Sequence, residues 1–184
     1  MEEIKDKLGH YKYNFFKNLQ NYLDTELIFY GSIKRADYFT NASDIDITVI
    51  TDNVTSVLSK LQNYLKINKS DIKKIYQKYY EASMQVVSGY KIKYNDLEHD
   101  LVFDILIYDE IYRTTVMENI NSINNLPTYM ILILYLLKFI YYNLYLISKS
   151  YFIYFKNCLF YMYFNKKIWV YENNRMSTII LDNF

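Results

Sequence analysis

The sequence predicts an α+β fold, in which a small mixed β-sheet with flanking helices is followed by a mainly helical C-terminal region. Short runs rich in Ile, Val and Thr, bounded by polar residues, are typical of strands, and apolar residues at helical spacing lie around them. Near residue 119 the character of the chain changes, and a long apolar stretch follows. We expect an α+β domain over residues 1–118 and a helical region over 119–184 that packs on it.

The first third of the chain alternates between expected helices and strands. Residues 2–23 carry apolar side chains at helical spacing, which predicts an amphipathic helix. A strand is expected over 26–30, a short helix over 33–38 and a strand over 44–51, where Val, Ile and Thr dominate. Residues 54–65 again follow the helical period and predict a second long helix.

The remaining elements are a hairpin and then mainly helices. Residues 71–81 fit a helix and a strand equally well. Two strand-like runs separated by a polar loop predict a hairpin, over 85–94 and 101–108. A polar connector is expected over 119–126. Beyond it we expect a helix over 128–148, a helix over 150–165, and a final hairpin of 168–171 with 178–181 around Asn173-Asn174.

The apolar stretch over residues 128–148 has two interpretations. Its length of about 20 residues equals that of a membrane span. Against a span stand Lys138 and Asn143 in its middle, five tyrosines, and the lack of flanking basic clusters. A core helix packed between the first domain and the last helix explains the stretch as well, so contact with a membrane stays open.

Composition limits the classes of function. The chain has 184 residues, 52% of them hydrophobic, which is enough for a full core. The formal charge of +1 lacks the basic surplus of a strong nucleic-acid binder. A single cysteine, Cys158, excludes an internal disulfide and a cysteine-based zinc site. The first 20 residues are charged and amphipathic and do not resemble a signal peptide, so we expect a cytoplasmic protein.

The most informative residues are Gly31-Ser32, followed twelve residues later by Asp44-Ile45-Asp46. Strand side chains alternate between faces, so Asp44 and Asp46 share one face, with Cα atoms roughly 6.5 Å apart. Two carboxylates so placed repel each other unless a cation lies between them, and Mg²⁺ prefers carboxylates, water and phosphate oxygens. At Gly31-Ser32 a strand meets an expected helix, where backbone N–H groups can point at an anion.

A third acid is expected from the run that surrounds Asp104. Six apolar residues flank this one carboxylate, from Leu101 to Ile107. An isolated carboxylate in such a strand is costly to bury without a partner. A metal ion is one such partner, although an acid on an edge strand would need none.

Taken together, Gly31-Ser32, Asp44 and Asp46, and the later Asp104 resemble the DNA polymerase β-like nucleotidyltransferase superfamily over about residues 25–110. The resemblance implies that Gly31 and Ser32 bind a nucleoside triphosphate and that all three acids ligate Mg²⁺ (or Mn²⁺) and carry catalysis. The residues around Gly31 and Asp44 are also similar to uncharacterised nucleotidyltransferases of large DNA viruses. Many members carry a second glycine where this chain has Ala36.

The same resemblance implies a role for Lys138. Members of the poly(A)-polymerase kind place a helical region after the catalytic domain, and it closes the nucleotide cleft from the opposite side. A Leu-rich helix with an embedded lysine is similar to residues 131–138, so Lys138 is expected to touch the triphosphate. The alternative is a lysine that snorkels from a core helix.

Three functions remain open from the sequence. The first is transfer of nucleotides to an RNA 3′ end, and the second is transfer of one nucleotide to a protein or small molecule. The third is a catalytically inactive subunit that kept the fold to bind nucleotide or RNA. Intact acids argue against the third, and the near-neutral charge weakens the first. The EF-hand alternative fails, because the twelfth position counted from Asp44 is Thr55.

Overall fold

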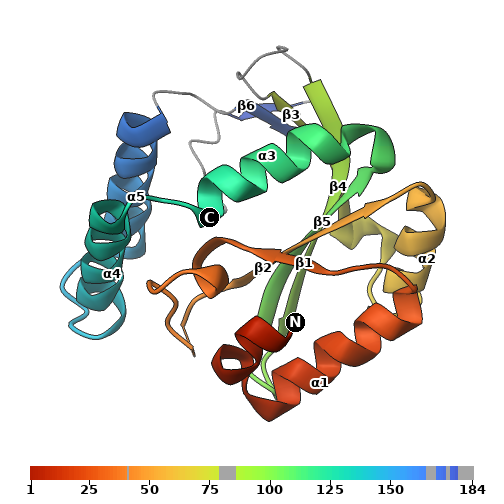
Figure 1. Cartoon of the computed structure of the whole chain (residues 1–184), viewed down its shortest axis with the longest axis horizontal. Helices are drawn as coiled ribbons and strands as arrows, with labels where there is room; N and C mark the ends of the chain where they lie inside the picture. The colour runs from red at the N-terminus through yellow and green to blue at the C-terminus, as the bar shows by residue number, and fades with distance from the viewer. Residues whose placement is uncertain (41, 79–85, 165–168, 173–174, 178–184) are drawn as a thin grey trace.

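Among the residues that the structure describes, a seven-stranded sheet has the order β1-β2-β5-β4-β3-β6-β7, and Figure 1 labels β1 to β6. The structure, a computed structural model, describes residues 1–40, 42–78, 86–164, 169–172 and 175–177. Strands β2 and β5 are parallel, and the other neighbouring pairs are antiparallel. The predicted α+β class with a mixed sheet is confirmed.

The bounds of the elements agree with most of the predicted ranges. The strands are β1 (Ile28–Tyr30), β2 (Ile45–Thr51), β3 (Ile72–Lys78), β4 (Val86–Asp96), β5 (Leu101–Asp109), β6 (Trp169–Glu172) and β7 (Arg175–Ser177). The α-helices are α1 (Lys5–Leu23), α2 (Val54–Leu65), α3 (Arg113–Asn124), α4 (Thr128–Tyr142) and α5 (Lys149–Phe164). Short 3₁₀ turns are η1 (Glu2–Ile4), η2 (Gly31–Lys34), η3 (Lys69–Asp71) and η4 (Glu110–Tyr112).

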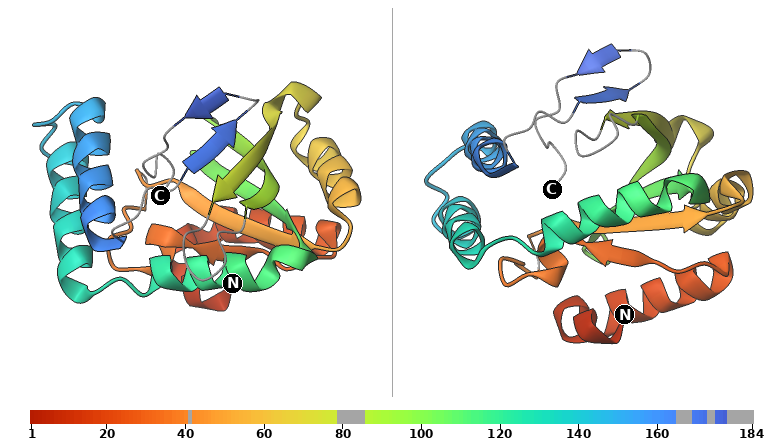
Figure 2. Two further views of the ribbon diagram at one scale, coloured as in Figure 1. Left: turned by 90° about the horizontal axis from the view of Figure 1, so that it is seen from above. Right: turned by 45° about the horizontal axis from the view of Figure 1, so that its top comes forward.

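The two faces of the sheet are covered by different helices (Figures 1 and 2). On one face, Ile45, Ile47 and Val49 of β2 belong to the main core, together with the apolar stripes of α1 and α2. On the other face, α3 packs on Ile50 of β2 and on Leu106 and Tyr108 of β5. Because side chains alternate along a strand, Asp46 shares this second face with Ile50, beyond the part that α3 covers.

Helices α4 and α5 lie side by side at one edge of the molecule (Figures 1 and 2). They form a helical hairpin with a small core of Leu126, Met130, Leu134 and Phe160. The inward stripe of α4 includes the buried Lys138, and that of α5 includes the buried Lys156. The hairpin therefore turns two lysines towards the sheet.

Two sequence predictions are wrong for identifiable reasons. The short helix over 33–38 does not form: the 3₁₀ turn ends at Lys34, and Arg35 is extended (φ −109°, ψ 175°). The polar connector over 119–126 is mostly helix, since α3 continues to Asn124. The buried stripe of α3, formed by Val116, Ile120 and Ile123, follows the helical period, but polar residues between these positions mask the pattern in the sequence.

Other ranges are refined by the structure. The ambiguous residues 71–81 contain strand β3, which is paired with β4 on one side and β6 on the other. The apolar stretch 128–148 is divided, because α4 ends at Tyr142. In the final hairpin the second strand is Arg175–Ser177, whereas the expected residues 178–181 lie outside the described residues.

The length and hydropathy of the helices bear on the alternative of a membrane span. Within the described part of the chain, no single helix is long and apolar enough to cross a membrane. One bent pair, residues 110–124 with 128–142 at an angle of 73°, passes the same test by length and composition.

Candidate active site

Three acids and two lysines cluster around one row of side chains on the second face of the sheet, in the part that α3 does not cover. Asp46 of β2 is directly opposite Asp104 of β5, and Asp104 is directly opposite Lys93 of β4. Asp44 and Lys91 each lie two residues from a member of this row, so they share its face. The register confirms that the two strands bring the predicted acids side by side.

A cavity of about 310 Å³ opens over this row. Asp44, Asp46 and Asp104 all line it, as does Ser32. The opposite wall comes from the helical hairpin. It consists of Lys138, Tyr141 and Tyr142 of α4 and Lys149, Phe152, Ile153 and Lys156 of α5. The cavity is therefore a cleft between the sheet and the hairpin, with the three carboxylates and Lys93 on the sheet side and three further lysines on the hairpin side.

The charge of Asp104 is balanced by lysine. Its Oδ2 atom lies 2.8 Å from Nζ of Lys91 and 3.8 Å from Nζ of Lys93. The Lys91 side chain is buried, and burial lowers the pKa of its ammonium group while Asp104 opposes the shift. The predicted third acid is therefore in the site, and its partner in this structure is a lysine.

The other two acids are less well compensated. Burial, together with the neighbouring Asp104, raises the pKa of Asp46 from 3.8 to about 7. Asp44 lines the cleft and is exposed to solvent. The surrounding protein nevertheless removes part of the hydration of its carboxylate, and this loss of hydration, together with the neighbouring Asp104, raises the pKa of Asp44. The site thus holds negative charge that a bound cation would stabilise.

Gly31 lies against the carboxylate of Asp46. Its φ is +74°, a conformation that favours glycine, and a Cβ there would lie 2.9 Å from Oδ2 of Asp46. The backbone N–H of Gly31 donates to Oδ1 of Asn124 at 2.9 Å, and an anion contact through the N–H groups of this turn stays a prediction. Ser32 is buried and lines the cleft, as expected for a ligand contact.

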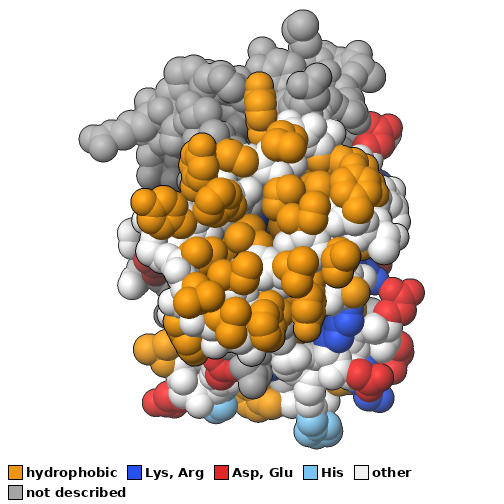
Figure 3. Space-filling model, turned by 90° about the vertical axis from the view of Figure 1, so that its left-hand side faces the viewer, with side chains coloured by type: hydrophobic (Ala, Val, Ile, Leu, Met, Phe, Trp, Pro, Cys, Tyr) orange, Lys and Arg blue, Asp and Glu red, His pale blue; other side chains and the backbone are white. Residues whose placement is uncertain are grey.

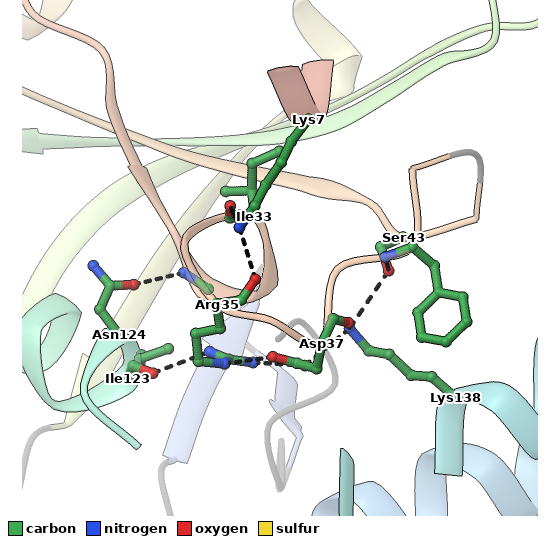
Figure 4. Close-up of polar contacts among 10 residues, drawn as sticks. Lys7, Ile33, Arg35, Asp37, Ser43, Ile123, Asn124 and Lys138 are labelled. Carbon is green, nitrogen blue, oxygen red and sulfur yellow. Dashed lines mark hydrogen bonds and ion pairs between the residues drawn. The ribbon is translucent and has the colours of Figure 1, made fainter. Parts of the chain in front are cut away.

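A buried ion-pair network holds the segment between Gly31 and Asp44 (Figure 4). Arg35 donates through Nε and Nη2 to the two carboxylate oxygens of Asp37, at 2.8 and 3.1 Å, and Nη1 donates to the carbonyl of Ile123 at 3.0 Å. Burial alone would raise the pKa of Asp37, but the Arg35 hydrogen bonds and the Lys138 charge outweigh it and lower that pKa.

Lys138 extends this network to α4. Its Nζ atom donates to the carbonyl of Asp37 at 2.8 Å and to Oγ of Ser43 at 3.4 Å, and lies 3.2 Å from Oδ2 of Asp37. Burial lowers the pKa of this lysine, and Asp37 opposes the shift. Lys138 lines the cleft, and its polar contacts are with the loop that leads to Asp44, so its implied contact with a triphosphate stays a prediction.

Aromatic contacts reinforce the same junction. The ring of Phe39 lies 5.1 Å from that of Tyr135 and 5.9 Å from that of Tyr142, between centroids. Tyr141 stacks on Phe152 at 4.5 Å, which links the two helices of the hairpin at the cleft wall. The hairpin therefore fixes the loop that ends at Asp44 as well as closing the cleft.

The residues fit a divalent cation by the chemistry of their ligand atoms. Carboxylate oxygens are the ligands that Mg²⁺ and Mn²⁺ prefer. Because Gly31 has no side chain, the carboxylate of Asp46 has room at its place in the cleft. Among the described residues, no three His, Cys, Asp or Glu side chains converge closely enough to hold a metal ion. Asp104 is instead paired with Lys91, whose ammonium group neutralises the third acid.

Several site residues are not predicted from the sequence. Lys91 and Lys93 show the same two-residue spacing as Asp44 and Asp46, so a search for charged pairs on strands could have found them. Lys149 and Lys156 are seven residues apart in an apolar helix, which puts them on one face. Arg35 and Asp37 carry no such signal, because nothing local indicates that this turn is buried.

Comparison with known proteins agrees with this geometry. A model of the nucleotidyltransferase domain family matches residues 13–121, which hold strands β1 to β5 and all three acids. Searches of curated proteins and of solved structures found no match. Since the match covers more than half of the 184 residues, the chain belongs to the nucleotidyltransferase domain family.

Proposed function

We propose that the protein transfers a nucleoside monophosphate from a nucleoside triphosphate to an acceptor hydroxyl, with release of pyrophosphate. The acceptor oxygen forms a bond to the α-phosphorus, the bond from that phosphorus to the oxygen bridging to the β-phosphate breaks, and the acceptor hydroxyl loses its proton. One observation carries the proposal: the cleft of about 310 Å³ joins all three acids with Ser32 and four lysines.

The chain's own groups divide into two sets in this reaction. Lys138, Lys149 and Lys156 on the hairpin side provide positive charge for a triphosphate, and Ser32 offers a hydroxyl. Such charge stabilises the phosphate oxygens as the bond to the leaving pyrophosphate breaks. In this proposal Asp104, which lies between Asp46 and the β4 lysines, accepts the proton of the acceptor hydroxyl.

Asp44, Asp46 and Asp104 would hold the divalent metal of this reaction. When bound, Mg²⁺ or Mn²⁺ neutralises triphosphate oxygens and makes an acceptor hydroxyl easier to deprotonate. The raised pKa values of Asp44 and Asp46 support this assignment, because burial and the neighbouring Asp104 both disfavour the charged carboxylates, which a bound cation would stabilise. Members of this family generally act as enzymes, and the three acids are present here.

The acceptor is the open part of the proposal, and an RNA 3′ end is the first candidate to test. A protein or a small molecule would meet the same chemistry, since each offers a hydroxyl. RNA binding should weaken strongly with salt, because phosphate contacts release counterions.

The proposal is tested by incubating the protein with each α-³²P-labelled nucleoside triphosphate, Mg²⁺ or Mn²⁺, and a short RNA. Label on RNA supports terminal transfer, and label on protein or on an added metabolite pool supports the second acceptor class. Asp46→Asn should abolish the label. Asp52→Asn, the same change in the exposed turn after β2, should leave it unchanged. Equal labelling by both variants, or none by the wild type, would overturn the proposal.

A further inference from the structure

The outward side of the α4–α5 hairpin is apolar, and none of the residues that the structure describes covers it. On α4 the exposed fractions of Tyr129, Leu132 and Leu136 are 58%, 58% and 51%. On α5, Tyr151 and Tyr154 are 63% and 62% exposed. Figure 3 shows hydrophobic side chains gathered over this side, with few charged ones among them. A helix that is apolar on all sides is normally buried, so this surface is expected to have a partner.

The spacing of these residues favours a helical partner. Tyr129, Leu132, Leu136 and Phe139 follow each other at intervals of three, four and three residues, opposite the buried stripe of α4. Tyr151, Tyr154 and Tyr161, with Cys158 between them, repeat this spacing on α5. Intervals of three and four are those of residues that pack between helices in bundles and coiled coils.

The area matches that of a stable protein interface. Side chains of this size present about 150–250 Å² each when fully exposed, and the twelve large apolar residues exposed on α4 and α5 are on average about half exposed, so together they present on the order of 1,000 Å². A stable interface needs roughly 800 Å² from each partner, whereas the largest patch on a typical monomer is about 300–600 Å². One such surface from each of two chains is enough for a dimer.

The charges favour a second copy of the same chain. Residues 128–164 contain only three charged side chains, Lys138, Lys149 and Lys156. All three line the cleft on the inward side. A two-fold interface pairs the same surface of both chains. If two copies pair through their outward sides, no like charges are therefore brought together. It also lacks the basic residues by which amphipathic helices bind anionic membranes.

We propose that two copies of this chain pair through the outward sides of their α4–α5 hairpins and form a four-helix bundle. The two clefts lie on the inward sides of the bundle and face away from each other. The tyrosines suit this interface, because each combines a large apolar ring with a hydroxyl that can find a polar partner at the rim. This inference does not depend on the proposed activity.

Sedimentation equilibrium of the purified chain tests the proposal. The wild type should have twice the 22.4 kDa mass of one chain at micromolar concentration. The double variant Leu132→Glu/Leu136→Glu should raise the dimer dissociation constant at least ~100-fold, since it places unpaired carboxylates from both chains in an apolar interface. Because both residues are exposed, the circular dichroism of the variant should match that of the wild type.

A matched control carries the same charges elsewhere. Leu97 and Ile111 are 85% and 75% exposed, outside the hairpin, so Leu97→Glu/Ile111→Glu should remain dimeric. A monomeric wild type would overturn the proposal. Flotation of that monomer with vesicles of phosphatidylcholine and phosphatidylserine would assign the surface to a membrane instead. A hairpin variant that stays dimeric would equally overturn it.

Discussion

Lys138 on α4 donates a hydrogen bond of 2.8 Å to the carbonyl of Asp37, 101 residues earlier in the chain, and lies 3.2 Å from its carboxylate. This pair joins the C-terminal hairpin to the loop that ends at Asp44. Asp37 also binds Arg35, whose guanidinium reaches the end of α3. The position of the first acid therefore depends on residues from both halves of the chain.

Lys138→Met should lower the free energy of unfolding by about 1–3 kcal/mol, because it leaves the buried Asp37 carbonyl without its donor and removes one cation from the Asp37 carboxylate. Arg35 remains paired with Asp37, which limits the loss. Urea unfolding measures the change. Lys149→Met is the control, because Lys149 is exposed at the same cleft and should change stability by less than about 0.5 kcal/mol.

The same variant distinguishes two roles for Lys138. If the lysine positions the loop, the stability and the turnover number fall together in Lys138→Met, while Lys149→Met lowers only the affinity for the triphosphate. Unchanged stability with a raised KM would instead show that Lys138 acts on the triphosphate, as the sequence resemblance implies.

Asp46→Asn should make the metal-free protein more stable above pH 7. The pKa of Asp46 is about 7 in the folded protein and 3.8 in the unfolded chain. At a pH between these two values the folded protein therefore binds one proton more than the unfolded chain does. Stability from this group is present below about pH 4, falls as pH rises, and is lost above about pH 7. At about 1.4 kcal/mol per pKa unit, the free energy of unfolding that the wild type loses between low and high pH is at most roughly 4 kcal/mol. Asn does not titrate, so the variant does not lose this stability.

Thermal unfolding in EDTA between pH 5 and 8.5 checks this. The melting temperature of the wild type should fall relative to that of Asp46→Asn as pH rises, by several degrees at the alkaline end. Asp52→Asn should follow the wild type, since Asp52 is exposed and outside the cleft. Parallel curves for wild type and Asp46→Asn would contradict the raised pKa.

Gly31→Ala should impair both stability and transfer. Alanine is strained at φ +74°, and its Cβ would lie 2.9 Å from Oδ2 of Asp46. We expect a loss of about 1–3 kcal/mol and displacement of the Asp46 carboxylate from its place opposite Asp104. Urea unfolding and metal-dependent triphosphate binding measure the two effects.

Gly9→Ala separates the two causes of that loss. Gly9 also has a positive φ, +69°, but a Cβ there would contact nothing within 4 Å. It should therefore show the backbone strain with normal triphosphate binding. Weaker binding in both variants would mean that strain alone, and not the contact with Asp46, explains the defect at Gly31.

The sequence was sufficient for strands β2, β4 and β5, and for the shared face of Asp44 and Asp46, because their signals are local. Alternation along residues 44–51 fixes the shared face of Asp44 and Asp46, and the apolar run around Asp104 marks a buried strand. The parallel pairing of β2 with β5 then places Asp46 opposite Asp104. Helix α3 was missed because its buried stripe is short and its other residues are polar.

What could not be predicted depends on contacts between distant segments. Arg35 and Asp37 are two residues apart in a polar turn, and only packing against α3 and α4 buries them. The N–H of Gly31 is bound by Asn124, from a segment predicted as a connector. The pairing of Asp104 with Lys91 likewise depends on the register of β4 and β5.

Lys91→Met should increase the affinity of the site for Mn²⁺. Lys91 is the nearest cation to Asp104, at 2.8 Å, and both side chains are largely buried. A metal ion that uses Asp104 must replace this ion pair, so removing the ammonium group leaves a carboxylate in need of a cation. Without metal the variant should lose about 3–5 kcal/mol of stability, and saturating Mn²⁺ should restore much of it, because a ligand that binds only the folded state stabilises it.

Titration of Mn²⁺ followed by electron paramagnetic resonance, with unfolding measured in parallel, tests this competition. Lys93→Met is the matched control, since Lys93 is 64% exposed in its side chain and 3.8 Å from the same oxygen. It should change the Mn²⁺ affinity by less than about threefold, as expected for an exposed pair. If Lys91→Met bound Mn²⁺ no better than the wild type, then Asp104 would take no part in the metal site, and Lys91 would be its permanent partner.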